Sequence, residues 1–276
     1  MLNVKSASDY LLPDLTQLLN LSFENYLVPI QFNLSQFQTM LRKDGIDLNA
    51  SRVLLVNEQP AGIGLIARRA TLGACRLAAM GIVKNMRGLG AGSWFMGKLI
   101  EEARERQDHE MFLEVIEQNE YALRLYQKCG FQSMRRLIGL IRKDAHENIQ
   151  AAIEEIDLST AGKLISQHGL SDLPWQLTGE TIAQLDPTAR AYRNGPAIMV
   201  ISNPDVEHIA ISSLLVEPEA RGKGLSVALL KNVIAHYQGK TWHVPAIFPE
   251  EFGGIFKRAG FEQENLSQWQ MRLTLS

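Results

Sequence analysis

The stretch from Val83 to Gly92, "VKNMRGLGAG", places three glycines and an arginine between an apolar run and a helix-like segment. A glycine inside a helix costs about 1 kcal/mol relative to alanine. Three within ten residues therefore point to a backbone requirement, either a positive φ or the close approach of another group to the main chain. The apolar run "CRLAAMGIV" ends at Val83, and "SWFMGKLIEEARERQ" follows with apolar residues at helical spacing. The stretch is predicted to be a strand-to-helix turn.

Strands and helices alternate on both sides of this turn. "SRVLLVNEQPAGIGLIARR" predicts two strands joined by a turn at Asn57–Pro60, and "MFLEVIE" predicts a further strand. "NEYALRLYQKCGF" predicts a helix that begins after Asn119 and stops at Gly130, and "LIGLIR" predicts a last strand. The N-terminal segment looks helical in two pieces, broken around Pro29. This order predicts a mixed α/β sheet.

The second half of the chain repeats these features in the same order. Arg87 and Arg221 are 134 positions apart, and Gly130 and Gly260 are 130 apart. "RGLGAG" returns as "RGKGLS", and "YQKCGF" returns as "FKRAGF". Matches in register indicate an internal duplication. We predict two domains, residues 1–143 and 144–276, with the polar stretch "KDAHENIQ" as the linker.

Length and composition set limits on function. The chain has 276 residues, only two cysteines, and no apolar run long enough to span a bilayer. Its start lacks the pattern of a signal peptide, and its six histidines form no ligand-spaced pair. We expect a cytoplasmic protein without a metal site and without a membrane partner.

The two halves differ in charge. Residues 1–143 carry 18 Lys and Arg against 14 Asp and Glu, a net charge of +4, and residues 144–276 carry 10 against 16, a net charge of −6. This is either scatter between two surfaces or a sign that the first half handles an anion. Nothing approaches the basic stripe of a nucleic-acid-binding protein.

Three kinds of phosphate-binding turn compete for the glycine stretch. A P-loop needs G-x-x-x-x-G-K-[ST], which neither half contains. A dinucleotide fingerprint needs G-x-G-x-x-G in the first βαβ unit, whereas about 80 residues with a hairpin precede this stretch. An arginine-led turn, R-x-x-G-x-G, presents backbone N–H groups and a helix N-terminus to a pyrophosphate and needs small residues there. A tight turn with no ligand is the remaining alternative.

Four segments carry a resemblance to a known family: "MGIVKNMRGLGAG", "FLEVIEQNEYALRLYQKCGF", "LLVEPEARGKGLS" and "IFKRAGF". They resemble the GNAT superfamily of acyl-CoA-dependent N-acyltransferases, and they cover residues 80–131 and 214–261. The resemblance implies two tandem GNAT-like domains of the mixed α+β class. In each, a mixed, mostly antiparallel sheet flanked by helices splays after its fourth strand, and acetyl-CoA lies in the gap.

The resemblance also implies which residues bind acetyl-CoA. The main chain at Ile82 and Val83 would pair with pantetheine, residues 87–93 would wrap the pyrophosphate, and an asparagine would contact the cofactor or the reaction centre. The implied cofactor-binding residues are Ile82, Val83, Arg87, Gly88, Leu89, Gly90, Ala91, Gly92, Ser93 and Asn119. For Asn119, helix capping alone is a sufficient alternative explanation.

Acetyl transfer needs a base for the amine and an acid for the leaving thiolate. Tyr126 in "LRLYQKCGF" matches the family position of the general acid; the alternative is an ordinary half-buried helix tyrosine. Glu114 in "FLEVIE" is the candidate base, acting through water; the alternative is an outward-facing carboxylate. The pattern "LEV…N…A…LY…GF" is also similar to ribosomal-protein acetyltransferases. Cys129 is expected to pack a helix end, since no activating base accompanies it.

The second half departs from the family pattern at two informative places. Alignment of Gly260 with Gly130 puts Phe256 at the position of Tyr126 and Pro249 at the position of Asn119. Neither can replace the polar side chain. The second domain is therefore expected to be degenerate, and either to retain coenzyme A binding or to act as a structural partner. Its candidate second cofactor loop consists of Val216, Arg221, Gly222, Gly224 and Ser226.

The leading prediction is an acetyl-CoA-dependent N-acetyltransferase with a catalytic first domain. The acceptor is expected to be a small-molecule or peptide amine. Tyr26 or Glu24 of the segment 23–32 would contact it, although the aromatic spacing of this segment is equally typical of a core. The alternative is a non-catalytic acyl-CoA-binding or regulatory protein, and a dinucleotide oxidoreductase ranks third. The protein is expected to be a monomer or a homodimer.

Overall fold

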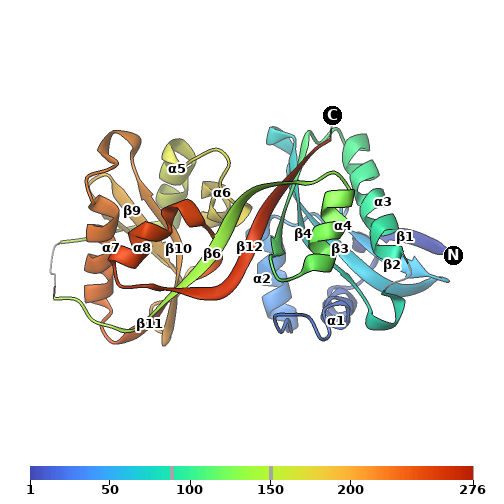
Figure 1. Ribbon diagram of the computed structural model, residues 1–276, viewed down its shortest axis with the longest axis horizontal. Helices are drawn as coiled ribbons and strands as arrows, with labels where there is room; N and C mark the ends of the chain where they lie inside the picture. The colour runs from blue at the N-terminus through green and yellow to red at the C-terminus, as the bar shows by residue number, and fades with distance from the viewer. Residues whose placement is uncertain (88–89, 149–151, 276) are drawn as a thin grey trace. The chain divides into compact units, whose positions relative to one another are not determined.

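The structure, a computed structural model, describes residues 1–87, 90–148 and 152–275 (Figure 1). It contains two compact units: unit 1 comprises Met1–Met134 and Trp269–Ser276, and unit 2 comprises Arg135–Gln268. The predicted division at residues 143 and 144 differs from these units, because each unit takes one strand from the other half of the sequence. As a division into functional domains, it stays a prediction.

Unit 1 contains a sheet with the strand order β1-β2-β3-β4-β5-β12. Neighbouring strands β1 to β4 are antiparallel, whereas β4 and β5 are parallel. Its elements are β1 (Leu2–Ser6), α1 (Leu12–Ser22), α2 (Leu34–Asp44), β2 (Arg52–Val56), β3 (Gln59–Arg69), β4 (Ala74–Ile82), α3 (Ala91–Glu105), β5 (Glu110–Ile116), α4 (Glu120–Lys128) and the C-terminal part of β12 (Glu262–Thr274).

Helices cover both faces of the unit 1 sheet (Figure 1). Leu15 and Leu19 of α1 and Phe37 of α2 pack in one apolar cluster on one face. Phe95 and Leu99 of α3 pack in a second cluster, which also contains Tyr126 of α4. Burial of apolar surface on both faces is the main stabilising contribution to such a layered unit.

Local sequence signals account for the boundaries of these elements. Asn57 and Glu58 have φ values of 49° and 64°, so a two-residue turn joins β2 to β3, as predicted. Asn33 and Gln36 form a capping box at the start of α2, and Gly45 ends that helix in the left-handed region. The predicted break of the N-terminal segment around Pro29 is confirmed by the gap between α1 and α2.

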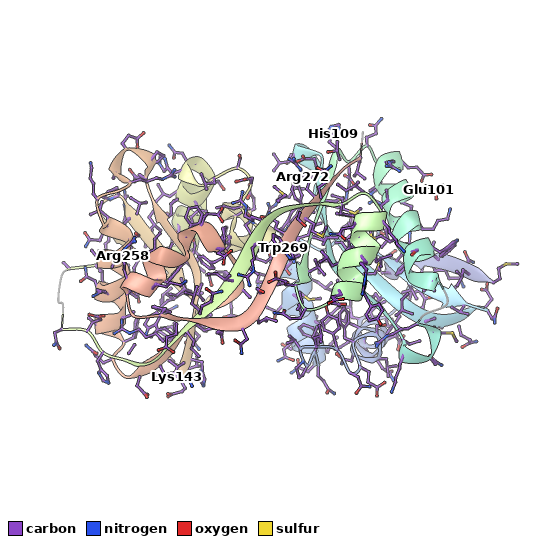
Figure 2. All side chains as sticks on the ribbon, viewed as in Figure 1. Glu101, His109, Lys143, Arg258, Trp269 and Arg272 are labelled. Atoms are coloured by element: carbon purple, nitrogen blue, oxygen red, sulfur yellow. The ribbon has the colours of Figure 1, made fainter. Side chains whose placement is uncertain are left out.

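The last strand of unit 1 comes from the far end of the chain. Leu273 and Leu275 belong to the same apolar cluster as Phe95. The Leu275 amide donates to the carbonyl oxygen of His109 over 2.9 Å, and Arg272 pairs with Glu110 over 3.2 Å (Figure 2). The C-terminal segment is thus an integral part of the unit 1 core.

Unit 2 repeats the plan of unit 1, with the strand order β6-β11-β10-β9-β8-β7. Its hairpin between β8 and β9 turns at Gly195 and Pro196, because Asn194 pairs with Ala197. Its elements are β6 (Gln132–Ala145), β7 (Glu154–Ile156), α5 (Leu158–His168), α6 (Gly179–Ile182), β8 (Arg190–Asn194), β9 (Ala197–Ile201), β10 (His208–Val216), α7 (Leu225–His236), β11 (Lys240–Pro249) and α8 (Gly253–Arg258).

Strand β6 pairs antiparallel with β11 of unit 2, from Ala145 opposite Lys240 to Leu137 opposite Pro249. Ile138 and Leu140 of this strand lie in the unit 2 core beside Trp242. The order of strands and helices confirms the predicted duplication. Within the described residues, no helix is both long and apolar enough to cross a membrane.

Candidate active site

The sheet of unit 1 opens between its two parallel strands. Cα pairing of β4 with β5 extends from Ala74 opposite Glu110 to Arg76 opposite Phe112 and, within the described residues, no further. The rest of β4, as far as Ile82, pairs on its other side with β3. This confirms the predicted splay and leaves one edge of β4 open beyond Arg76.

A buried ion pair lies where the two strands separate. The guanidinium of Arg76 donates to Glu114 Oε2 from Nε over 2.7 Å, and its Nη2 lies 2.6 Å from the same oxygen. The side chains of Arg76 and Glu114 are 7% and 3% exposed, and Asp44 Oδ2 lies 3.8 Å from Arg76 Nη1. Burial alone would lower the pKa of Arg76, but the negative charges of Glu114 and Asp44 have the larger effect and raise this pKa.

Glu114 is directed toward Arg76, from which it accepts hydrogen bonds, rather than toward solvent. Glu114 is also almost completely shielded from water. The structure places it as the partner of Arg76 at the opening of the sheet. The assignment of Glu114 as the general base stays a prediction. Arg76 is not among the predicted site residues, although a charged residue inside the apolar run "CRLAAMGIV" indicates a buried ion pair or a functional position.

The glycine-rich loop leads from β4 into α3. Gly90, with φ 78°, is the N-cap of α3 and provides no side chain to cap the first amides. An alanine Cβ at Gly90 would meet nothing within 4 Å, so glycine is needed here for its backbone conformation. The uncapped first turn, Ala91 to Ser93, carries the positive end of the helix dipole and favours an anion. Gly88 and Leu89 of the predicted loop lie outside the described residues.

Arg87 holds the loop by its side chain. Its Nε donates to the carbonyl oxygen of Ile82 over 2.8 Å, and its Nη2 donates to the carbonyls of Ser22 and Glu24 over 2.9 and 3.2 Å. Ser22 is the last residue of α1, where unpaired carbonyls and the negative end of the helix dipole favour a cation. Arg87 therefore anchors the loop to α1, and its guanidinium is occupied by main-chain carbonyls.

Ile82 and Val83 are the two residues predicted to pair with pantetheine through the main chain, and Val83 already makes a main-chain hydrogen bond. The amide of Val83 donates to the carbonyl of Ala61 in the strand β3 over 2.9 Å, so Val83 faces the closed side of β4. Ile82, the preceding residue, faces the open side, because main-chain groups alternate along a strand. Of the two, the geometry favours Ile82 for pairing with a ligand.

Tyr126 lies on α4 with its side chain in the unit 1 core. It is 8% exposed and contacts Phe131 edge-on, with the ring centroids 5.8 Å apart. Its hydroxyl has no hydrogen-bond partner among the described residues. Burial, followed by the electrostatic effects of Tyr26 and Cys129, raises the pKa of Tyr126 far above its ordinary value. The hydroxyl is thus a proton donor at any physiological pH.

Asn119 links α4 to the segment between α1 and α2. Its Oδ1 accepts a hydrogen bond from the Ala122 amide over 3.1 Å, which caps α4, and its Nδ2 donates to the Tyr26 hydroxyl over 3.2 Å. The structure thereby brings Tyr26 to α4, which carries Tyr126, although Tyr26 lies 93 positions before Asn119. Burial raises the pKa of the nearby Cys129 thiol, which disfavours a thiolate nucleophile.

A groove of about 800 Å³ opens over the segment between α1 and α2 in unit 1. Its lining is mixed: polar side chains, Gln17, Asn20, Glu24, Asn25 and Tyr26 among them, alternate with apolar ones such as Leu21, Phe23 and Ile30. The segment is held by Asn20, whose side chain exchanges two hydrogen bonds of 2.9 Å with the main chain of Phe32. Tyr26 belongs both to this groove and to the Asn119 contact.

Unit 2 repeats the loop with the same anchor. Arg221 donates from Nε to the carbonyl of Val216 over 3.0 Å and from Nη2 to the carbonyl of His168, the last residue of α5, over 2.6 Å. Gly222 and Gly224 have φ values of 79° and 76°, and Gly224 is the N-cap of α7. Ser226 lies in the first turn of α7, at a cavity of about 350 Å³.

Comparison with known proteins supports this reading of the fold. Residues 12–131 match the model of the acetyltransferase (GNAT) family. No curated protein sequence gives a significant match. Within residues 1–87, 90–148 and 152–275, no cluster of three or more His, Cys, Asp or Glu side chains could hold a metal ion.

Solved structures resemble the chain over its full length. A GCN5-related N-acetyltransferase from Sphaerobacter thermophilus is 14% identical with a TM-score of 0.70, over 100% of this chain and 95% of that one. A tandem GNAT protein from the clavulanic acid biosynthesis pathway, solved without AcCoA, is 14% identical with a TM-score of 0.67, over 100% and 99%. A putative acetyltransferase from Pyrococcus horikoshii is 13% identical with a TM-score of 0.68, over 99% and 89%.

Proposed function

Since the chain is a tandem two-module protein of the GNAT superfamily, we propose that unit 1 is an acetyl-CoA-dependent N-acetyltransferase acting on a primary amine. The observation that carries the proposal is the hydroxyl of Tyr126, which is protonated and makes no hydrogen bond to the described residues, although its ring packs in the unit 1 core. The hydroxyl is not among the fully buried unpaired side-chain atoms, so it is accessible at the edge of the core, where it is available to a ligand.

The residues of unit 1 fit acetyl-CoA at two places. The uncapped first turn of α3, from Ala91 to Ser93, offers main-chain amides to the pyrophosphate. The open edge of β4 offers the main-chain amide of Ile82 to the pantetheine arm, since the Ile82 carbonyl already accepts a hydrogen bond from Arg87, and Asn119 would contact its thioester end. Arg87 positions the loop through its anchor on α1. Bound acetyl-CoA supplies an acetyl group activated as a thioester.

Tyr126 donates its proton to the departing sulfur as the C–S bond breaks. The acceptor releases one proton to solvent before it attacks as a neutral amine, and its nitrogen releases a second proton once the C–N bond has formed. Because burial raises the pKa of Tyr126, its phenolate readily takes up this second proton, and the hydroxyl is restored. Glu114 has no proton-transfer step in this proposal. Its pair with Arg76 holds the two strands at the opening of the sheet.

The acceptor amine approaches from the groove over the segment between α1 and α2. Glu24 lines the groove, and residues 10–41 contain Asp14 and Glu24 but no Lys or Arg. The guanidinium of Arg87, which donates to the Glu24 carbonyl, offsets one of these two negative charges and leaves a net charge of −1. A local excess of negative charge attracts a protonated amine. The cytoplasmic location and the monomeric or homodimeric state remain predictions.

The test compares Tyr126→Phe with Tyr121→Phe. Tyr121 lies on the same helix but is 85% exposed, which makes it a matched control. Release of free thiol from acetyl-CoA is measured with a panel of amino acids, polyamines and peptides, and acetyl-CoA binding is measured by calorimetry. Tyr126→Phe should lower kcat by about 10²–10⁴-fold with binding intact, whereas Tyr121→Phe should change neither.

Unchanged turnover in Tyr126→Phe would remove Tyr126 from the mechanism. Acetyl-CoA binding without thiol release for any amine would favour the alternative, a non-catalytic acyl-CoA-binding or regulatory protein. Phe256 and Pro249 at the equivalent positions of unit 2 favour that alternative for unit 2 alone.

A further inference from the structure

A cavity of about 350 Å³ lies inside unit 2, and its lining runs from the glycine loop to the opening of the sheet. Gly222, Gly224 and Ser226 line one end, at the uncapped start of α7. An anion is favoured at this end, as at α3, because the first amides of the helix have no side-chain cap.

The cavity passes between the two faces of strand β10. Leu214 and Val216 pack with the core on the α7 side, Leu215 packs with the core on the α5 side, and all three line the cavity. Pairing of β10 with β11 extends from His208 to Ala210 and, within the described residues, no further. The cavity therefore occupies the splay of the unit 2 sheet.

Beyond the splay the lining is apolar. Ile165, Leu170, Leu173 and Leu177, from α5 and the segment after it, form this end. The corresponding segment of unit 1 lines a mixed groove, in which Gln17, Asn20 and Glu24 stand beside apolar residues. An apolar end favours a hydrocarbon chain and offers nothing to a charged amine.

One polar side chain in the middle of the cavity lacks a partner. Ser213 is 6% exposed, lines the cavity, and makes no hydrogen bond within the described residues. Its equivalent in unit 1, 134 positions earlier, is Ala79. A hydroxyl buried between an anion-binding end and an apolar end suits a carbonyl oxygen between a charged carrier and a hydrocarbon chain.

We propose that unit 2 binds, without transferring its acyl group, a coenzyme A thioester whose acyl chain is longer than acetyl. The phosphates lie at the start of α7, the thioester carbonyl accepts a hydrogen bond from Ser213, and the chain fills the apolar end. Phe256 and Pro249 provide no proton donor for a leaving thiolate. The identity of the carrier rests on the function proposed for unit 1, because the two loops share an arginine anchor and a glycine N-cap with positive φ.

The test is calorimetry on the full-length protein with coenzyme A, acetyl-CoA, butyryl-CoA, octanoyl-CoA and octanoate alone. One site should gain affinity about fourfold per added methylene until the cavity is full, which corresponds to about 0.8 kcal/mol each. Octanoate alone should bind at least tenfold more weakly than octanoyl-CoA. Ser213→Ala, which installs the residue present in unit 1, should weaken octanoyl-CoA about threefold to tenfold.

Two matched variants assign the sites. Ser226→Asp puts a carboxylate at the anion end of unit 2, and Gly92→Asp puts one at the equivalent position of unit 1, where a Cβ has ordinary contacts. Loss of the chain-length-dependent site in Ser226→Asp alone supports the proposal. Its loss in Gly92→Asp alone, or affinity independent of chain length, overturns the proposal and leaves the function of unit 1 standing. Loss of acetyl-CoA binding in Ser226→Asp but not in Gly92→Asp would instead overturn the function proposed for unit 1.

Discussion

The openings of the two sheets have the same backbone and different side chains. Strand pairing ends at Arg76 in unit 1 and at Ala210 in unit 2, 134 positions apart. The register of each strand shifts just beyond, at Ala78 and at Ser212. Since a β-bulge re-aims the residues after it, both sheets present the following residues in the same way. The duplicated backbone has been retained in both units.

The side chains at these openings separate packing from chemistry. Tyr126 contacts Phe131 with centroids 5.8 Å apart and planes at 64°, and Phe256 contacts Phe261 at 5.8 Å and 68°. The core therefore requires an aromatic ring at this position in both units, and phenylalanine is sufficient. Because packing does not require the hydroxyl, its presence in unit 1 alone has another cause. The same logic applies to the Arg76–Glu114 pair, which Ala210 and Pro245 replace in unit 2.

Among the differences between the units, substitution of the Arg76–Glu114 pair is expected to have the largest effect. Glu114→Ala leaves the buried Arg76 without its main partner and should lower the free energy of unfolding of unit 1 by about 3–5 kcal/mol. Arg76→Ala combined with Glu114→Ala approaches the unit 2 sequence and should cost less than the two single changes added together. Urea unfolding of the three variants measures this. If Glu114→Gln folds normally but has lost turnover, Glu114 is the base after all.

Truncation of the exchanged strand should affect one unit. Met271 is fully buried in the unit 1 core, and Met271→Ala should lower stability by about 2–5 kcal/mol. Hydrogen exchange should speed up in β4, β5 and α3 and stay unchanged in α7 and β10. Arg272→Ala, which removes an adjacent side chain that is 46% exposed, should cost below about 1 kcal/mol. Faster exchange in unit 2 would contradict the assignment of this strand.

Arg87 and Arg221 make matching contacts in the two loops, so substitution of each arginine tests the similarity between the units. Lysine cannot reproduce the forked contacts that Arg87 makes with Ile82 and Ser22, or that Arg221 makes with Val216 and His168. Arg87→Lys and Arg221→Lys should each lower the free energy of unfolding by about 1.5 kcal/mol, as measured by thermal unfolding. Acetyl-CoA binding to Arg87→Lys should keep the salt dependence of the wild type. A shallower salt dependence would mean that the guanidinium contacts phosphate directly.

The smallest expected effect is the pH dependence that Tyr126 adds to unit 1 and that Phe256, at the equivalent position, cannot add to unit 2. Above a pH of about 10, unfolded tyrosine releases a proton that buried Tyr126 retains, because burial raises its pKa in the folded state. The unfolded chain then binds fewer protons, so stability falls as the pH rises further. Between pH 9 and pH 11, the free energy of unfolding measured in urea should therefore fall by about 1 kcal/mol less in Tyr126→Phe than in the wild type. An identical slope would show that Tyr126 is not buried in solution.

Features that depend on neighbouring residues could be predicted from the sequence. The turn at Asn57, the cap at Asn119 and the two glycine loops follow from backbone preferences, and the duplication follows from their repetition. The Arg76–Glu114 pair joins residues 38 positions apart, and the Arg87 anchor reaches 65 positions back to Ser22. Such contacts depend on the packed sheet. The exchange of β6 and β12 could not be predicted from the sequence either, since an apolar strand pattern does not specify which sheet the strand joins.

The exchanged strands impose an order on biosynthesis. Unit 1 is translated first, yet its sheet needs Trp269–Leu275, which follow the 134 residues from 135 to 268. At about 5–20 residues per second, the ribosome takes roughly 7–27 s to deliver them. Throughout that interval the edge of β5 in the nascent chain lacks its neighbour and can pair with other polypeptides. The half proposed to perform catalysis is therefore the last to be completed and the one most in need of a chaperone.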